Sequence, residues 1–276
     1  MNKSLFGDIT TLALDHPGAQ DLNYRARRNQ IAEAARAYAI DPSMIPMIEY
    51  TAEEHTTWNV VTRTLRPLHE AHASALHLAA QSHLRISTNK IPQLRSLSAS
   101  IERAHGFTLA PTEGLIDPRL FLTALGRRVM FCTQYIRHAS KPEYTPEPDI
   151  IHEVIGHVPA FLDRDMADFS HTIGTLAARA SNKEFIELER LYWYTIEFGL
   201  IREEGKTKAF GAGFLSSIGE LAHAMSHPEI AKPFRIQEVI KTPYAFSAMQ
   251  TTLFIMPSFA EVQKQTTLHY KHLLIN

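Results

Sequence analysis

Two histidines and one glutamate are the residues of this chain whose types and order could form a metal site. His152 and His157 lie five residues apart, and Glu197 follows in a later segment rich in aromatic and aliphatic residues. Two imidazoles and one carboxylate can bind a divalent metal on one face and leave the other face open, which is typical of non-haem iron(II) oxygenases. The pattern therefore raises the hypothesis of an iron-dependent oxygenase centre.

The five-residue spacing of the histidines limits how they could share one metal. On a regular α-helix, positions five apart point about 140° away from each other. Both imidazoles can face one ion only if the helix ends between them, and Gly156 is the residue expected to end it. A zinc hydrolase that uses the same triad is the alternative metal enzyme. Glu153 lies beside His152, as a catalytic glutamate would in such an enzyme. The two histidines are five residues apart, however, whereas those of a zincin helix are four apart.

Each of these residues also has an ordinary structural explanation. The chain contains 15 histidines, so about one pair five apart is expected by chance, and the two histidines could be core or cap residues. Glu197 lies in the apolar stretch 191–200, where an unpaired carboxylate is costly. Its partner could be a metal, or Arg190 or Arg202 in an ion pair.

Helix signals dominate the elements that must position these residues. Thr51 and Glu54 form a capping box that predicts a helix start, and apolar residues recur at three- and four-residue spacing from Trp58 onward. Pro67 interrupts this run and predicts a kink or an end. Three histidines are expected on a polar face of this region and not in a second metal site: His69, His72 and His77.

The rest of the chain predicts further helices and a small amount of sheet. Asp117 and Gly126 are the expected N-cap and stop of one helix. Extended structure is predicted for 129–136 and for 244–256. The expected fold is therefore mostly α with small β elements. The remaining helices are expected to begin near Pro92, Pro118, Pro148, Asn182, Ser217 and Ser258, and Gly156 and Leu200 are the expected ends of two of them.

Length and composition limit the class of protein. A chain of 276 residues can bury a substantial core, and we expect a single catalytic domain over 41–276 preceded by a loosely assigned N-terminal segment over 1–40. The formal net charge of −1 argues against nucleic acid or an anionic membrane as a partner. The single Cys132 allows no intrachain disulfide, and no signal peptide or membrane-spanning stretch is found, so a cytoplasmic protein is expected.

Several longer segments carry a resemblance to one enzyme family. They are Cys132–His138, Tyr144–Asp149, His152–Pro159, Tyr192–Gly199 and Gly211–Ser217, with Trp58 and Ile91–Leu94 in support. Together they resemble the tetrahydropterin-dependent aromatic amino acid hydroxylases, from about Glu49 to about Gln263. The residues in these segments are more similar to the animal-type catalytic domain than to the common proteobacterial phenylalanine hydroxylases. The resemblance implies the catalytic fold of this family.

The resemblance also implies a reaction and its cofactors. It implies Fe(2+) bound by His152, His157 and Glu197, a tetrahydrobiopterin or related tetrahydropterin, and O2. Ligation needs neutral imidazoles, so metal binding should weaken at acid pH. The expected reaction is hydroxylation of the ring of L-phenylalanine. The para position, which gives tyrosine, is the first choice. The alternatives are a 3-hydroxylase that gives meta-tyrosine and an inactive member that binds an aromatic ligand.

On the substrate side, the resemblance assigns roles residue by residue. Arg137 matches the arginine that binds the substrate carboxylate. A guanidinium suits that task because its fork contacts both carboxylate oxygens. A structural pair with Asp149, beside Pro148, is the alternative, and both roles can hold. Ser216 is assigned near the polar end of the amino acid, or to holding a metal ligand in place. The other residues implied are Thr145, Trp193, Phe198 and Phe246.

On the pterin side, the resemblance assigns an aromatic side chain, a loop and an acid. Phe121 matches the aromatic residue that stacks on the pterin ring, and Glu153 matches the acid beside the pterin and the iron. For each aromatic residue taken alone, core packing is the simpler explanation. The loop whose backbone meets the pterin edge is matched by Gly114, Leu115 and Ile116.

Three positions depart from the animal-type pattern. Phe131 replaces a histidine and Glu189 replaces a small residue, both on the pterin side. Phe246 replaces a small aliphatic residue near the substrate ring. A displacement of the ring by about 1 Å can change the rate strongly, and it could change which ring carbon reacts. No regulatory module and no coiled-coil helix are expected, so the predicted state is a monomer or a small dimer.

Overall fold

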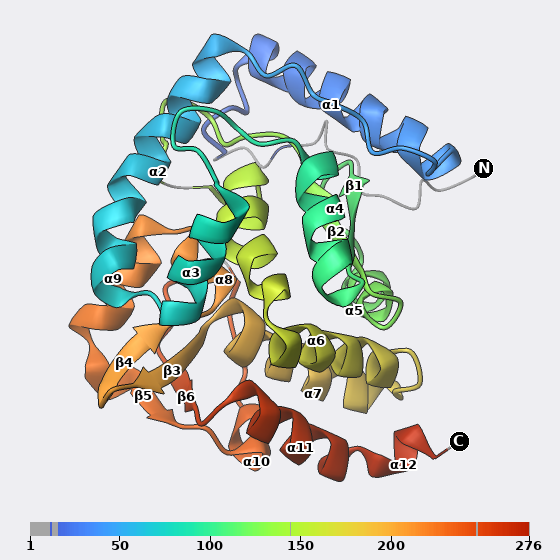
Figure 1. The fold of residues 1–276 in the computed structure, drawn as a ribbon, viewed down its shortest axis with the longest axis vertical. Coiled ribbons are helices and arrows are strands. Elements are labelled where there is room, and N and C mark those ends of the chain that lie inside the picture. The colour runs from blue at the N-terminus through green and yellow to red at the C-terminus, as the bar shows by residue number, and fades with distance from the viewer. Residues whose placement is uncertain (1–11, 13–15, 144, 247, 276) are drawn as a thin grey trace.

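The computed structural model describes residue 12 and residues 16–143, 145–246 and 248–275 (Figure 1). Most elements are helices, with α1 at one edge of the molecule and α11 and α12 at the opposite edge. The helical elements are α1 (Leu22–Ile40), α2 (Ala52–His72), α3 (Ala75–Leu84), α4 (Leu94–His105), α5 (Pro118–Leu125), η1 (His152–His157), η2 (Val158–Leu162), α6 (Arg164–Ala177), α7 (Asn182–Tyr192), η3 (Trp193–Glu197), α8 (Ala212–Leu215), α9 (Ile218–Ser226), η4 (Pro228–Ile230), α10 (Ile236–Val239), α11 (Phe259–His269) and α12 (Lys271–Leu274).

The described strands form two small sheets. They are β1 (Thr108–Thr112), β2 (Val129–Thr133), β3 (Gly199–Glu203), β4 (Lys206–Ala209), β5 (Ala231–Pro233) and β6 (Leu253–Met256). β1 and β2 pair in parallel. The second sheet has the order β4-β3-β6-β5, in which only the β3–β4 pair is antiparallel. The prediction of a mostly α fold with small β elements is confirmed.

Several local predictions for helix ends are confirmed. Thr51 and Glu54 form both hydrogen bonds of a capping box at the start of α2. Asp117 caps α5, which begins at Pro118 and ends before Gly126. These ends follow from short-range hydrogen bonds, because a side-chain oxygen accepts from the first free backbone N–H groups of the helix. Local sequence is therefore sufficient to locate them.

An end of the helix at Pro67 is not observed, the predicted kink stays a prediction, and the placement of the histidines after Pro67 was predicted wrongly. Helix α2 does not end at Pro67 but continues to His72. Leu65 and His69, on either side of the proline, are both buried, so packing holds the helix across the lost hydrogen bond. His69 and His77 do not form a polar face, since their exposed fractions are 3% and 1%.

Two predicted extended segments and one predicted helix are shorter than expected. The strand predicted for 129–136 ends at Thr133, and only Leu253–Met256 of 244–256 is a strand. The helix predicted to reach Leu200 ends at Glu197, because Gly199 already begins β3 and pairs with β6. Tertiary pairing thus decides these boundaries.

The described part of the N-terminal segment packs on the rest of the chain. In α1, the buried Arg28 donates to Glu147 at 2.8 Å, and the Tyr24 hydroxyl donates to the carbonyl of Ile136 at 3.0 Å. Arg36 pairs with Glu113 at 2.6 Å. Helix α1 is therefore fixed to the body, and the expected boundary at residue 40 stays a prediction.

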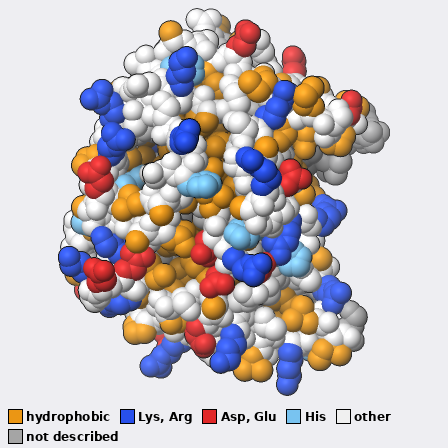
Figure 2. All heavy atoms as spheres, in the orientation of Figure 1, with side chains coloured by type: hydrophobic (Ala, Val, Ile, Leu, Met, Phe, Trp, Pro, Cys, Tyr) orange, Lys and Arg blue, Asp and Glu red, His pale blue; other side chains and the backbone are white. Residues whose placement is uncertain are grey.

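The surface in Figure 2 mixes charges of both signs. Lysine, arginine, aspartate and glutamate side chains are interspersed on this face, as the net charge of −1 suggests. Among the described residues, no helix has the length and apolar character needed to cross a bilayer.

Candidate active site

The two histidines lie on a π-helical turn and not on a regular α-helix. The N–H of Val158 donates to the carbonyl of Glu153, five residues earlier, at the end of η1. A hydrogen bond from i+5 to i brings residues five apart about one turn from each other, so His152 and His157 share one face. The prediction that Gly156 ends the helix is wrong, because the chain continues through Gly156 into η2.

Gly156 has a different role, which is to let a second helix approach. A Cβ atom at this position would lie 2.8 Å from the carbonyl oxygen of Ala212, at the start of α8. Contacts that short are essentially absent from proteins, so α8 can pack on η1 only because residue 156 is glycine. This approach brings Ser216, directly after α8, close to His152.

Glu197 comes from a second π-helical turn, η3. The N–H of Phe198 donates to the carbonyl of Trp193 at 2.8 Å, again five residues apart. Tyr192 lies five residues before Glu197 and lines the same cavity, and its hydroxyl helps to lower the pKa of the Glu197 carboxyl group. From the sequence alone, Tyr192 has no assigned role beyond its place in the segment Tyr192–Gly199. The same five-residue spacing could have identified it as a partner of Glu197.

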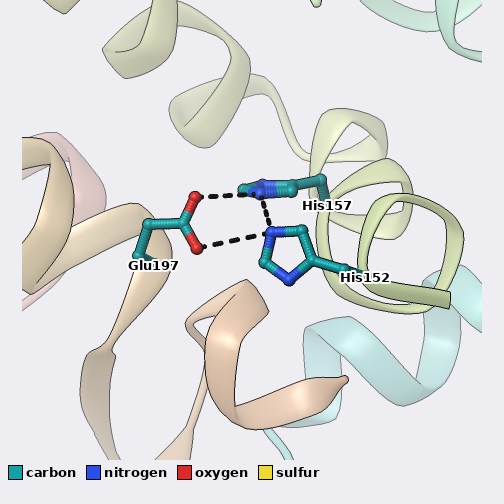
Figure 3. A group of neighbouring side chains, drawn as sticks. All are labelled: His152, His157 and Glu197. Atoms are coloured by element: carbon teal, nitrogen blue, oxygen red, sulfur yellow. Dashed lines mark hydrogen bonds and ion pairs between the residues drawn. The ribbon is translucent and has the colours of Figure 1, made fainter. Parts of the chain in front are cut away.

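The three side chains converge from these two turns (Figure 3). His157 Nε2 lies 3.0 Å from Glu197 Oε1, His152 Nε2 lies 3.6 Å from Glu197 Oε2, and the two Nε2 atoms are 3.0 Å apart. Metal–ligand bonds of about 2.0–2.2 Å at right angles place donor atoms about 3 Å from each other. The geometry and the donor types therefore fit a divalent ion bound on one face.

Ser216 fixes the tautomer of His152. Its hydroxyl donates to the carbonyl of Ala212 at 2.7 Å, so its oxygen is the acceptor for His152 Nδ1, 3.0 Å away. The proton of His152 is then on Nδ1, and Nε2 keeps its lone pair for a metal. Of the two roles expected for Ser216, this contact fits the one of holding His152 in place.

Burial and mutual charge set the protonation of the triad. Burial opposes the ionisation of Glu197, but His157 and His152 outweigh it and lower its pKa to about 2. Burial lowers the pKa of His152 to about 4. For His157, the adjacent Glu197 carboxylate outweighs burial and raises the pKa above its usual value.

The alternative partners of Glu197 are excluded by geometry. Arg190 donates through Nη1 to the carbonyl of Ile240, and Arg202 donates to the carbonyl of Gly205. Neither arginine forms an ion pair with Glu197 among the described residues. The charged partners of the carboxylate within the described residues are therefore the two imidazoles.

The triad opens into a cavity of about 890 Å³, a volume that includes the space at its open mouth. Aromatic and aliphatic side chains dominate its wall, with a few carboxylates among them. The lining residues are Thr112, Gly114, Leu115, Ile116, Pro118, Phe121, Leu122, Phe131, Thr133, Pro148, His152, Glu153, His157, Glu189, Tyr192, Trp193, Glu197 and Tyr244.

All of the residues assigned to the pterin side lie on this wall, and so does Pro148. Phe121 packs edge-on against Tyr192, with ring centroids 5.7 Å apart. Glu153 accepts hydrogen bonds from the backbone N–H and the hydroxyl of Thr133, both at 3.2 Å. Burial raises the pKa of Glu153 to about 7. Phe131 and Glu189, the two departures on this side, also line the cavity.

The residues assigned to the substrate ring are only partly placed together. Trp193 lines the cavity, and Phe198 packs against it with ring centroids 4.8 Å apart. Tyr244, which the sequence analysis did not single out, stacks on Trp193 at 4.3 Å. Phe246 does not line the cavity, because its side chain is 78% exposed. Its placement near the substrate ring was predicted wrongly. One residue separates it from Tyr244, and the chain turns outward between them.

The residues assigned to the polar end of the substrate lie behind the cavity wall. The Arg137 guanidinium donates two hydrogen bonds to Asp149, each at 2.9 Å, its backbone N–H donates a third at 2.8 Å, and both side chains are buried. Thr145 donates to the carbonyl of Glu147 at 2.8 Å. Neither Arg137 nor Thr145 is among the lining residues. The predicted Arg137–Asp149 pair is present, and binding of substrate by Arg137 stays a proposal.

Similar sequences include monooxygenases of two kinds. A tyrosine 3-monooxygenase from Homo sapiens is 46% identical over 257 residues, which are 91% of this chain and 48% of the relative. A phenylalanine-4-hydroxylase from Rattus norvegicus is 43% identical over 259 residues, which are 92% of this chain and 57% of the relative. The chain thus spans about half the length of the curated relatives it matches.

Similar structures are bacterial phenylalanine hydroxylases. The enzyme from Chromobacterium violaceum with bound iron(III) and 7,8-dihydrobiopterin has a TM-score of 0.76 at 28% identity, over 82% of this chain and 83% of that one. The apo enzyme from Colwellia psychrerythraea 34H has a TM-score of 0.78 at 28% identity, over 82% and 87%.

The family profile gives the widest match. The profile described as biopterin-dependent aromatic amino acid hydroxylase matches residues 3–274, which is almost the whole chain. The expected likeness to the animal-type enzymes agrees with the higher identity of the mammalian relatives. The chain therefore belongs to the family of biopterin-dependent aromatic amino acid hydroxylases.

Proposed function

We propose that this protein is an iron(II)- and tetrahydropterin-dependent monooxygenase that hydroxylates the ring of L-phenylalanine with O2, at the para position. The observation that carries the proposal is the convergence of His152, His157 and Glu197 at an aromatic cavity. The family match supports the same cofactors. A cytoplasmic location and a monomeric or small dimeric state stay predictions.

The side chains of this chain would bind, orient and shield the reactants. When bound, iron and the reduced pterin supply the activation of O2. The triad binds a metal from one side and leaves positions free toward the cavity. Ser216 keeps the lone pair of His152 directed at the ion. Trp193 and Tyr244 form an apolar wall that excludes water from an aromatic ring.

Glu153 is the group on the wall that is suited to hold or release a proton. It is buried and its pKa is raised to about 7. A carboxyl group with such a pKa is present in both protonation states near neutral pH. Its Oε1 is held by Thr133, so the group has a fixed position beside His157 and the cavity. We propose that it hydrogen-bonds the polar edge of the pterin.

Phenylalanine is favoured over tyrosine by the apolar wall around Trp193, although relatives of both kinds are similarly close. Human tyrosine 3-monooxygenase is 46% identical and rat phenylalanine-4-hydroxylase is 43% identical. The case for the meta position depended on a bulky Phe246 near the ring, and the exposed Phe246 removes that support. Para-hydroxylation therefore stays the first choice.

Product analysis tests this proposal directly. The iron(II)-loaded protein is mixed with a tetrahydropterin, O2 and either phenylalanine or tyrosine, and products are separated against tyrosine, meta-tyrosine and dihydroxyphenylalanine. We expect tyrosine from phenylalanine, with O2 uptake that requires the pterin. Meta-tyrosine would overturn the ring position, and reaction with tyrosine alone would overturn the substrate. A zinc-loaded protein without pterin-dependent uptake would support the hydrolase alternative.

A further inference from the structure

A second carboxylate on the cavity wall, that of Glu189, has no partner within the described structure. Glu189 lies on α7, lines the cavity and is half-buried. Among the described residues, no hydrogen bond or ion pair within 4 Å involves its carboxylate. The two arginines that lower its pKa have other hydrogen-bond partners, since Arg119 donates to the carbonyls of Ala177 and Ala180 and Arg190 donates to that of Ile240. Glu189 is therefore free to accept hydrogen bonds from a ligand in the cavity.

The position of Glu189 along the helix places it at the outer part of the cavity. It lies on the regular helix α7, about one turn before η3 begins at Trp193 and eight residues before Glu197, so it is displaced from the triad along the helix axis. Glu153 is buried beside the triad, whereas Glu189 is partly exposed. A ligand that reaches from the metal to the mouth would meet Glu153 with its inner part and Glu189 with its outer part.

The chemistry of a carboxylate restricts what it can recognise there. An ionised carboxylate only accepts hydrogen bonds, and hydrogen bonds to charged groups are stronger than those between neutral groups. In a half-buried site it also repels a second negative charge, because the screening by water is incomplete. Burial raises the pKa of Glu189, in agreement with a position removed from full solvation.

We propose that Glu189 selects the reduced pterin by its substituent, binding neutral substituents that carry hydroxyl groups and excluding anionic ones. This inference depends on the proposed function, since it concerns the same cofactor cavity. It assigns to Glu189 a role in specificity and none in the chemical step. The glutamate at position 189, where the resemblance implies a small residue, would thus give this chain its own pterin specificity.

Direct binding under anaerobic conditions tests the proposal without turnover. Calorimetry measures the affinity of the iron(II)-loaded protein for tetrahydrobiopterin, for 6-methyltetrahydropterin, which lacks hydroxyl groups, and for 6-carboxytetrahydropterin, which is anionic. The variants are Glu189→Ala and the isosteric Glu189→Gln. Glu102→Gln, on the exposed side of α4, removes the same charge outside the cavity lining and is the control.

The two variants have different expected effects. Glu189→Ala should weaken tetrahydrobiopterin about tenfold, to the level of the methyl compound, because the charged acceptor is lost. Glu189→Gln keeps an acceptor and should weaken tetrahydrobiopterin by only about threefold, while it tightens the carboxy compound about tenfold. Glu102→Gln should change none of the three affinities.

The outcomes separate this inference from the proposed function. If neither Glu189 variant changes the affinity for any of the three pterins, the selective role is wrong, although hydroxylation can still proceed. If the unaltered protein binds no reduced pterin at all, the proposed function itself fails. If the carboxy compound tightens equally in Glu102→Gln, the effect is one of overall charge and the inference is overturned.

Discussion

The structure contains two histidine pairs with almost the same ring geometry but different surroundings. The rings of His152 and His157 meet edge-on, with centroids 4.7 Å apart at 82°. Those of His69 and His77 also meet edge-on, at 5.0 Å and 89°. Only the first pair has a carboxylate at ligand distance, since His152, His157 and Glu197 are the sole group of three potential metal-binding side chains found among the described residues.

The protonation of the rings separates the two pairs further. His69 Nε2 lies 2.8 Å from the carbonyl of Leu215, which can only accept, so this nitrogen carries the proton. In His152 the proton is on Nδ1, because Ser216 accepts from that atom. Two neighbouring imidazoles are therefore not a metal site by themselves. The carboxylate and the partners of the remote nitrogens decide it.

Removal of the Glu197 carboxylate should have the largest effect on the difference in metal binding between the two pairs. Glu197→Ala leaves two imidazoles without an anionic ligand, as in the other pair. We expect iron(II) affinity to fall by about 100-fold or more and pterin-dependent turnover to be abolished. Metal content after dialysis against a weak chelator measures the loss. Retained stoichiometric iron would reject Glu197 as a ligand.

Removal of the tautomer-fixing hydroxyl should have a smaller effect of the same kind. In Ser216→Ala, His152 loses the acceptor for Nδ1–H. Loss of such a supporting hydrogen bond typically weakens metal binding by about 10–100-fold. The same metal titration measures it. Ser217→Ala, which removes the neighbouring helix cap of α9, is the matched control and should leave iron affinity unchanged.

The second pair should contribute to stability and not to metal binding. His69→Leu removes the donor to the buried carbonyl of Leu215, which should cost about 1–3 kcal/mol of unfolding free energy. Urea unfolding of the metal-free protein measures the cost. The variant should still bind one iron per chain, and loss of that iron would show that the two pairs are coupled.

The smallest expected effect that distinguishes the two pairs is the dependence of metal affinity on pH. In the metal-free protein, Glu197 raises the pKa of His157, so this imidazole keeps its proton above the usual range and the ion pair is lost as pH rises through the raised pKa. A metal must displace that proton, so affinity should increase with pH by at most about tenfold per pH unit near neutrality. His69 and His77 have pKa values lowered by burial and should remain neutral.

Proton release during metal titration in weak buffer measures this effect. We expect up to one proton per ion at pH 6.5 and fewer at pH 8. His157→Gln should abolish the pH dependence together with most of the binding. Release that is independent of pH would contradict the assigned protonation of His157.

Local predictions from the sequence were right where the forces are local. The capping box of Thr51 and Glu54 and the cap at Asp117 depend on hydrogen bonds within one turn, and both are present. Predictions failed where distant elements decide. Helix α2 crosses Pro67 because both sides are packed, and the chain after Tyr244 turns Phe246 to the surface.

The sequence by itself determined the ligand types, their order and the family, because long ordered motifs around His152 and Glu197 identify a chemistry whatever their exact conformation. Only the tertiary structure decided how two histidines five apart face one ion. A regular helix turns them away from each other, and the π-helical turn that aligns them is packed against α8 through the missing side chain of Gly156. Such a contact joins residues far apart in the chain, so no local pattern could contain it.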